Sequence, residues 1–479
     1  MASIGGPIQQ VPPELLTEIF LRFSDIAHDI SRKGESAWVL THVCQLWREI
    51  ALRTPPLWAS FVYTNSTRFP LKLIRTQLAL SKREPLLFRV DFACDALIPI
   101  QVLLKETIGL CVFDILMEEA DRWKNVTLLI PDDALGLFVD IITTSQDEFS
   151  LLQSFSIYRQ RVLFTDGITI PSSMFIAAPI LSTIKLFPFI DVLFPWSQLT
   201  EIETSRLPVD VEFMIIRESP FLRKLVTTNR CGLEDLTVPN VQPVIHTALR
   251  VFGPMYTSIL PHLVLPSLTQ LVFDFFVDRD PPDALSDFIG RSGSFLRCLS
   301  LLIHLPSPAT ALPAGFEQQF VNTFSQMHVL VELRVELNFT PMLDHEQDLG
   351  PILLDALQSS PLVIPKLEKL EISARRCICS LEDIVGLVQY RWVKAVVSGG
   401  GVARLRVVDV ECDGLRKMSR DDSFHCMENL RRFKKEGLEF SVVINGAPFD
   451  WESYTVGPPR FDSLEASDAL DISDTDSVD

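Results

Sequence analysis

The sequence predicts an α/β protein in which a small N-terminal helical bundle precedes an irregular solenoid of short parallel strands alternating with helices. Three observations predict this fold: a leucine- and tryptophan-rich helical pattern near the N-terminus, a strand phrase that recurs along the rest of the chain, and helical patterns between the later phrases. We expect four regions. They are a helical bundle over 8–62, a helical connecting region over 63–122, the solenoid over 123–450 and a disordered acidic tail over 461–479.

The composition is that of a globular protein. Of the 479 residues, 47% are hydrophobic and 22% are charged. The formal net charge is -18, and an acidic surface repels phosphate groups. We therefore expect no nucleic-acid partner and no docking on anionic membranes.

No segment of the sequence is expected to cross a membrane. The best apolar stretch, 180–196, is interrupted by Lys185, Asp191 and two prolines, whereas a span needs roughly 20 mostly apolar residues. The first ten residues have no positive charge and no apolar core, so they do not resemble a secretory signal. Nine scattered cysteines then favour reduced thiols, and the expected location is the cytoplasm or the nucleus.

The N-terminal bundle is predicted from two helical patterns. The first helix opens at Pro12 and Pro13, where a missing N–H costs nothing. Its apolar stripe at helical spacing consists of Leu15, Leu16, Ile19 and Phe20. A polar loop over 24–36 follows. The second helix has an apolar face formed by Val39, Val43, Leu46, Trp47 and Ile50. This helix stops at 54–56, because proline disfavours the α region in the residue before it. A short apolar segment formed by Leu57, Trp58 and Phe61 follows and ends the bundle.

The strand phrase has the approximate form L-x-x-L-x-L, which is the strand portion of a leucine-rich repeat. It follows a region over 63–122 that remains helical in pattern apart from a strand-like segment at 86–91. The phrase occurs at 126–130, 152–157, 181–186, 222–226, 268–273, 296–301, 330–335, 367–372 and 403–408.

The phrases are unevenly spaced. The steps between Leu271, Leu299, Leu333, Leu370 and Leu405 are 28, 34, 37 and 35 residues. Segments between them carry helical patterns, as at 283–291 and 381–397, and prolines before several phrases indicate a sharp turn into each strand. A unit of this kind cannot bury its apolar face alone, which favours stacking into a solenoid. An ordinary α/β domain with a parallel sheet is the alternative; the basic residue that repeatedly precedes the second leucine favours the solenoid.

Three phrases of the N-terminal region resemble the F-box family. Residues 11–20 read V-P-P-E-L-L-T-E-I-F, residues 40–51 read L-T-H-V-C-Q-L-W-R-E-I-A, and residues 54–58 read T-P-P-L-W. They are similar to the opening L-P-x-E-[LI]-L-x-x-I-F, the segment V-C-x-x-W-R-x-[IL]-A and the close T-P-x-L-W of large fungal F-box families. Val11 departs mildly from the leucine that the family prefers. The match covers about a tenth of the chain, and the remainder resembles the leucine-rich-repeat-like region of those proteins more loosely.

The resemblance implies a substrate-recruiting adaptor of a Skp-cullin-RING ubiquitin ligase. In that family a helical F-box bundle docks on a Skp-type adaptor, which ties it to a cullin, and the repeat region would bind a protein substrate whose identity the sequence does not give. The residues carried over as adaptor-binding are Pro12, Leu15, Leu16, Ile19, Phe20, Val43, Cys44, Trp47 and Trp58.

The surplus of apolar residues in the bundle agrees with this role. A unit of about fifty residues buries too little surface to hide all of them, and an apolar face with tryptophan anchors is typical of a protein interface. The alternative is a stand-alone repeat scaffold in which the bundle is only an N-terminal cap, since terminal repeats need shielding. Burial of Leu15, Leu16 and Ile19 together would favour the cap.

No catalytic, cofactor-binding or metal-binding residues are predicted. Cys377 and Cys379, with Cys412 and the pair at 425–426, are a poor zinc site, because zinc pairs use a gap of two to four residues. The glycines at 399–401 follow a helix and precede a strand, the reverse of a phosphate loop. Nothing assembles a nucleophile, a base and an orienting group, so we expect a non-enzymatic protein.

Overall fold

The computed structural model describes most of the chain in two compact units. Described are residues 11–24, 28–30, 32, 34, 36–64, 71–92, 110–131, 136, 138, 141, 149–159, 175, 178–187, 194–228, 242–254, 256–276, 282–292, 295–305, 316–339, 349–358, 363–379, 381–397, 401–415 and 420–449. The first unit comprises residues 1–274 and 291–293, and the second comprises 275–290 and 294–479. The acidic tail expected over 461–479 lies outside the described residues.

The strands of the first unit form a parallel sheet in which neighbours follow the order of the sequence. They are β1 (Ser60–Thr64), β2 (Leu86–Asp91), β3 (Trp123–Ile130), β4 (Ser154–Arg159), β5 (Thr183–Phe187), β6 (Glu201–Ser205), β7 (Lys224–Thr228), β9 (Val251–Gly253) and β11 (Gln270–Phe276), the last of which ends in the second unit. The short strands β8 (Val244–Ile245) and β10 (Leu263–Val264) pair separately.

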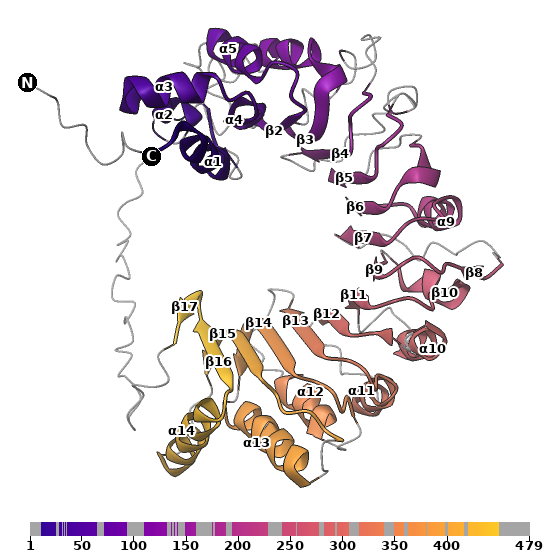
Figure 1. Ribbon diagram of the computed structural model, residues 1–479. Coiled ribbons are helices and arrows are strands. Elements are labelled where there is room, and N and C mark those ends of the chain that lie inside the picture. Colours follow the sequence, from indigo (N-terminus) through magenta and orange to yellow (C-terminus); the bar gives the residue numbers. More distant parts are fainter. Residues whose placement is uncertain are drawn as a thin grey trace, which may run out of the picture. The chain divides into compact units, whose positions relative to one another are not determined.

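Helices of the first unit lie mainly in its N-terminal third (Figure 1). The α-helices are α1 (Pro13–Ser24), α2 (Leu40–Val43), α3 (Gln45–Leu52), α4 (Pro56–Ala59), α5 (Leu71–Ser81) and α9 (Val209–Glu218), and residues 110–117 are also helical. The 3-10 helices are η2 (Ala37–Val39), η3 (Ala120–Arg122), η5 (Trp196–Gln198) and η6 (Thr257–His262).

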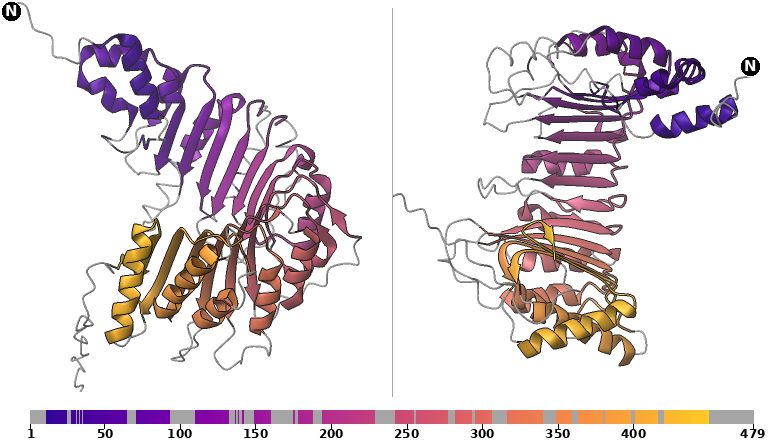
Figure 2. Two further views of the ribbon diagram at one scale, coloured as in Figure 1. Left: turned by 60° about the horizontal axis from the view of Figure 1, so that its bottom comes forward. Right: turned by 90° about the vertical axis from the view of Figure 1, so that its left-hand side faces the viewer.

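The second unit repeats the plan with longer elements. Its strands are β12 (Cys298–Leu305), β13 (Glu332–Phe339), β14 (Lys369–Cys379), β15 (Val407–Leu415) and β16 (Glu439–Ile444), all parallel, and β17 (Ala447–Pro448), antiparallel to β16. Its helices are α10 (Pro282–Ser292), α11 (Phe316–Ser325), α12 (Leu349–Gln358), α13 (Leu381–Val397) and α14 (Arg420–Lys435). Helices α11 to α14 cover one face of the strands and leave the other face open (Figure 2).

A single turn leads into most strands, and it explains the recurring phrase. In the turn before β7, Pro220 fixes the second position and the Leu222 N–H donates to the Ser219 carbonyl at 3.0 Å. The leucine that closes the turn is directed inward, and the next two inward positions lie on the strand. The closing leucines are all 0% exposed: Leu152, Leu181, Leu199, Leu222, Leu249, Leu268, Leu296, Leu330, Leu367 and Leu405.

These observations confirm a mixed α/β fold with a long, mostly parallel sheet. Strand order follows sequence order within each unit, whereas a doubly wound α/β sheet reverses direction at a switch point. The arrangement is therefore compatible with stacked repeats. The helices expected at 283–291 and 381–397 are α10 and α13. The parallel sheet begins at Ser60, before the region over 123–450 in which the solenoid was expected, because β1 pairs with β2 and β2 pairs with β3.

The first edge of the sheet is covered by a segment of the bundle. The Val62 N–H on β1 donates to the His28 carbonyl, and the Ile30 N–H donates to the Val62 carbonyl, both at 2.8 Å. The Thr64 hydroxyl donates to the Asp29 carboxylate at 2.8 Å. Backbone groups of an edge strand otherwise invite pairing with another chain, so residues 28–30 close this edge.

Arg391 is a buried cation that joins α13 to the turn before β14. It is fully buried, and its guanidinium donates to the carbonyls of Ile364 and Val363 at 2.8 and 2.6 Å and to that of Leu357 at 3.5 Å. Burial lowers the pKa of Arg391 to about 10, although Tyr390 opposes the change. The carbonyl oxygens at the end of α12 and in the following turn thus gain donors from a neighbouring helix.

Candidate protein-binding face

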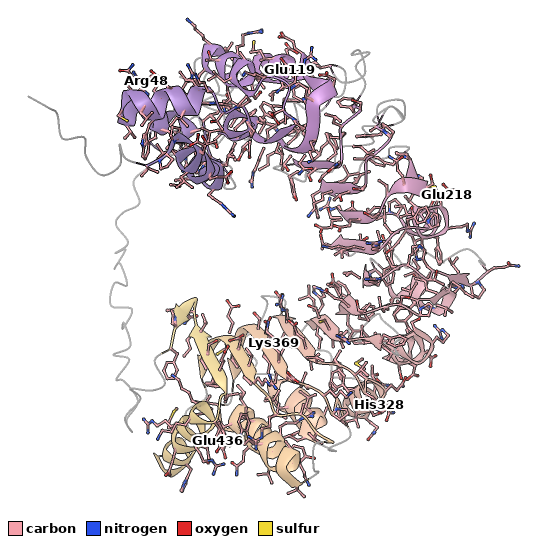
Figure 3. The ribbon with its side chains drawn as sticks, in the orientation of Figure 1. Arg48, Glu119, Glu218, His328, Lys369 and Glu436 are labelled. Carbon is pink, nitrogen blue, oxygen red and sulfur yellow. The ribbon has the colours of Figure 1, made fainter. Side chains whose placement is uncertain are left out.

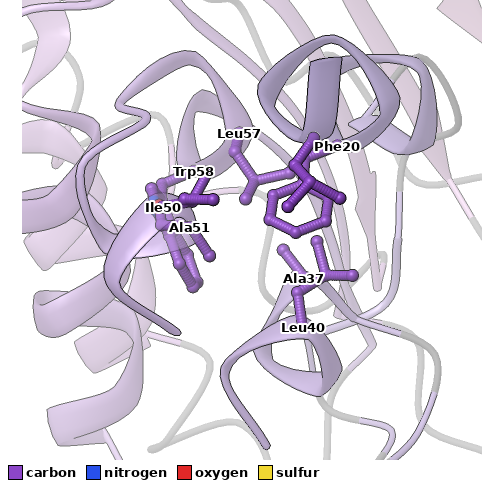
Figure 4. Packing of buried hydrophobic residues seen from close by; sticks show 8 residues of the cluster. Phe20, Ala37, Leu40, Ile50, Ala51, Leu57 and Trp58 are labelled. Atoms are coloured by element: carbon purple, nitrogen blue, oxygen red, sulfur yellow. The ribbon is translucent and has the colours of Figure 1, made fainter. Parts of the chain in front are cut away.

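The N-terminal helices pack around one small core. Its buried members are Leu16, Phe20, Ala37, Leu40, Ile50, Ala51, Leu57 and Trp58 (Figure 4). Leu16 and Phe20 are four residues apart on α1 and therefore share one helical face. The Trp58 indole N–H donates to the Ala51 carbonyl at 2.8 Å, which satisfies its buried polar atom. Both aromatic rings thus fix α1 and α4 against α3.

A second apolar row on α1 faces solvent. Leu15 and Ile19 are each 55% exposed, and they too are four residues apart. Val43, at the end of α2, is 52% exposed, and Pro12 is exposed at the start of α1. Isolated exposed leucines are common in proteins. Four large or rigid apolar residues exposed in a bundle of this size are a surplus of the kind found at interfaces.

Trp47 and Cys44 lie between the core and solvent. Trp47 is half-buried, and its ring meets the Phe20 ring edge-on with centroids 5.0 Å apart. The Trp47 indole nitrogen is buried without a hydrogen-bond partner. Cys44 is half-buried in an extended conformation directly before α3, and its side chain does not cap the helix. Both side chains are therefore partly accessible to solvent.

The nine residues identified from the sequence thus fall into three sets. Leu16, Phe20 and Trp58 lie in the core and support the face from beneath. Trp47 and Cys44 are half-buried. The exposed set consists of Pro12, Leu15, Ile19 and Val43, which we call the apolar face.

Leu52 is one exposed apolar residue of the bundle that sequence reasoning missed. It is 37% exposed in the last turn of α3. The second apolar pattern in the sequence ended at Ile50 and did not include Leu52. Its place just before the stop at 54–56 was the available signal.

Polar contacts hold the helices that carry the apolar face. The Arg48 guanidinium donates to the Thr41 carbonyl at 2.7 Å, which ties α3 to α2 (Arg48 is labelled in Figure 3). The Thr54 hydroxyl donates to the Ile50 carbonyl at 2.8 Å at the end of α3. Glu14 and Glu18, next to Leu15 and Ile19 in sequence, are exposed. Exposed apolar residues on firmly held helices, with acidic neighbours, suit another protein better than a small polar ligand.

The described residues contain no metal-like cluster. Within them, no group of three His, Cys, Asp or Glu side chains could hold an ion; the side chains of Cys377 and Cys379 lie outside that set. Among the helices in the described ranges, none combines the length and apolarity needed to cross a membrane.

Comparison with known proteins gives little. No protein-family model matches the chain, and no curated protein matches it in sequence. Among solved structures it is similar to the crystal structure of a Bacteroides fragilis protein, a structural-genomics target, with a TM-score of 0.31 and 10% identity. The match covers 72% of this chain and 84% of that chain. A likeness of this strength carries no argument about fold or function.

Proposed function

We propose that the protein is a substrate-recruiting F-box adaptor of a Skp-cullin-RING ubiquitin ligase, active in the cytoplasm or the nucleus. One observation carries the proposal: the three phrases that resemble an F-box fold into a single bundle that leaves Pro12, Leu15, Ile19 and Val43 on its surface. That is the arrangement expected if the bundle docks on a Skp-type adaptor. A protein that served only as a cap would have buried Leu15 and Ile19.

The mechanism is tethering rather than chemistry. The apolar face holds the ligase side, and the repeat array holds a protein substrate. Joining the two raises the effective concentration of a substrate lysine near the ubiquitin-conjugating enzyme, which can strengthen a weak encounter by orders of magnitude without any new contact. The chain itself supplies no catalytic residue and no cofactor in this mechanism.

The test is co-purification of the full chain with a Skp-type adaptor. We expect wild type to retain the adaptor and the double variant Leu15→Asp/Ile19→Asp to lose at least about tenfold in affinity, because two charges would be buried in an apolar interface. The matched control is Leu151→Asp/Ile180→Asp, at two apolar residues that are exposed on turns of the array. Failure of wild type to bind, or equal loss in both variants, would reject the proposal.

A stand-alone interaction scaffold is a second candidate, and one observation favours it. Residues 28–30 and α4 close the first edge and end of the sheet, as a cap would. Capping uses the loop and α4, whereas the apolar face lies on α1 and α2. An adaptor-binding result that is negative for wild type, with a folded bundle, would support the scaffold.

A further inference from the structure

The turns before the strands place one residue of each repeat in a continuous row. The residue after the closing leucine uses its carbonyl to accept N–H groups from the next repeat. The Arg223 N–H donates to the Thr200 carbonyl at 2.8 Å, the Arg250 N–H to the Arg223 carbonyl at 2.9 Å, and the Thr269 N–H to the Arg250 carbonyl at 2.8 Å. Neighbouring members of such a row are about 4.8 Å apart.

Elsewhere on the array, several opposite charges on neighbouring strands form ion pairs. Such cross-strand pairs are worth some tenths of a kcal/mol to about 1 kcal/mol each. On the open face of the first unit, Glu203 lies between Lys185 and Lys224, at 3.0 and 2.5 Å. In the second unit the pairs are Lys369 with Glu332, Arg334 with Glu371, and Arg406 with Glu368 (Figure 3 labels Lys369).

Arg223 and Arg250 are instead a pair of like charges. They are direct neighbours in the row, both are exposed, and neither guanidinium forms a hydrogen bond or ion pair with a described residue. Like charges directly opposite each other destabilise a sheet. A local arrangement that opposes stability without a compensating contact points to function.

An exposed aromatic side chain lies two residues before Arg223 in the sequence. Phe221 is 64% exposed in the turn before β7, and only the buried Leu222 separates it from Arg223 in sequence. Aromatic residues, phenylalanine among them, and arginine are enriched at protein interfaces. Phe221, Arg223 and Arg250 together form what we call the arginine rim.

A buried histidine fixes the two turns that carry the arginine rim. The His246 Nδ1 accepts the Leu249 N–H at 3.1 Å, so the proton of the neutral ring lies on Nε2. The Nε2–H then donates to the Ser219 carbonyl at 2.9 Å, in the turn of Phe221. Because His246 joins both turns, the backbone that carries the rim is held in place before any partner arrives, which lowers the entropy cost of binding.

We propose that the arginine rim binds an acidic peptide segment of another protein. The two guanidiniums hold carboxylates by charge-assisted hydrogen bonds, and Phe221 packs on an apolar side chain of the same segment. The net charge of the chain is -18, so the surface as a whole repels an acidic partner, and the two guanidiniums supply a local attraction. The binding stands without the ligase; that the bound segment belongs to a ubiquitination substrate rests on the proposed function.

Fluorescence anisotropy of the purified full chain tests the proposal. The probe is a fluorescein-labelled glutamate-rich peptide with a central leucine, and the same peptide with lysine for glutamate is the negative probe. We expect salt-sensitive binding of the acidic probe alone, weakened at least about tenfold by Arg223→Glu/Arg250→Glu. Arg83→Glu/Arg89→Glu changes the net charge equally at two exposed arginines of the same unit, and should stay within about twofold of wild type.

Three results would overturn the proposal. They are unchanged binding in Arg223→Glu/Arg250→Glu, an equal loss in Arg83→Glu/Arg89→Glu, and binding that appears only after residues 461–479 are removed. In the last case the occupant would be the acidic C-terminal segment of the chain itself. Circular dichroism of each variant verifies folding. The measurement contains no Skp-type adaptor, so its failure and failure of the ligase proposal are distinguishable.

Discussion

Leucine side chains differ in burial between the N-terminal bundle and the repeat array. In the array, the leucine that closes each turn is 0% exposed because the neighbouring repeats cover it on both sides. In α1, Leu16 is buried while Leu15, the next residue, is 55% exposed. A repeat always has a neighbour of its own kind, whereas the bundle ends the stack and has none on its outer side. The apolar surface that remains there is available to another protein.

The largest expected difference between the two regions is in stability. Leu367→Ala should lower the free energy of unfolding by about 2–5 kcal/mol, because it leaves a cavity in a packed layer. Leu15→Ala should cost less than about 0.5 kcal/mol, as for a solvated surface position. Urea unfolding followed by circular dichroism measures both. Similar costs at the two positions would contradict the contrast in packing.

Removal of the buried guanidinium should rank next. Arg391→Met keeps much of the side-chain volume but leaves the carbonyls of Ile364 and Val363 without their donor. We expect a loss of about 2–3 kcal/mol, the cost of unpaired buried polar groups. Lys394→Met, on the same helix, provides the control and should change stability by less than about 1 kcal/mol. If Arg391→Met left the free energy of unfolding unchanged, the hydrogen bonds between α13 and the turn before β14 would not stabilise the fold.

The smallest effect should come from the ion triad on the open face of the first unit. Burial raises the pKa of the Glu203 carboxyl, but hydrogen bonds from Lys224 and Lys185 outweigh it and hold that pKa below its ordinary value. A depressed carboxyl pKa contributes stability above the unfolded value, about 4.3, and that stability is lost as pH falls through the folded value.

Glu203→Gln should therefore cost roughly 1 kcal/mol at neutral pH and flatten the loss of stability on acidification. Glu201→Gln removes a more exposed carboxylate of the same strand and should do neither. Thermal unfolding at pH 7 and at mildly acidic pH compares the two variants. An unaltered pH profile in Glu203→Gln would show that the triad does not stabilise the fold.

Much of the architecture could be predicted from the sequence because it depends on the spacing of apolar residues. The L-x-x-L-x-L phrase predicted the strands, and helical periodicity predicted α10 and α13. That the first leucine of the phrase closes the turn before the strand became apparent only in the structure. The start of the sheet at β1 was not predicted, because Ser60–Thr64 follows α4 directly and overlaps the short apolar segment that was expected to end the bundle.

Surface features were less predictable than elements. Helical spacing grouped Leu15, Leu16, Ile19 and Phe20 in one stripe, but it could not assign which pair faces the core, since that depends on where α3 and α4 pack. The adjacency of Arg223 and Arg250, 27 positions apart in the sequence, depends on strand register and was invisible at that level. The packing of helices and the register of strands, rather than composition, decide which side chains stabilise the fold and which can bind a partner.

The closed edge at β1 has a consequence for synthesis of the chain. Residues 28–30, which pair with Val62, leave the ribosome before that strand does. Each later strand joins one made just before it, so the growing sheet exposes only its newest edge during translation. Aggregation through an unpaired edge strand is thereby limited to the most recently made strand. The edge at β1 is already covered by residues 28–30 when that strand forms.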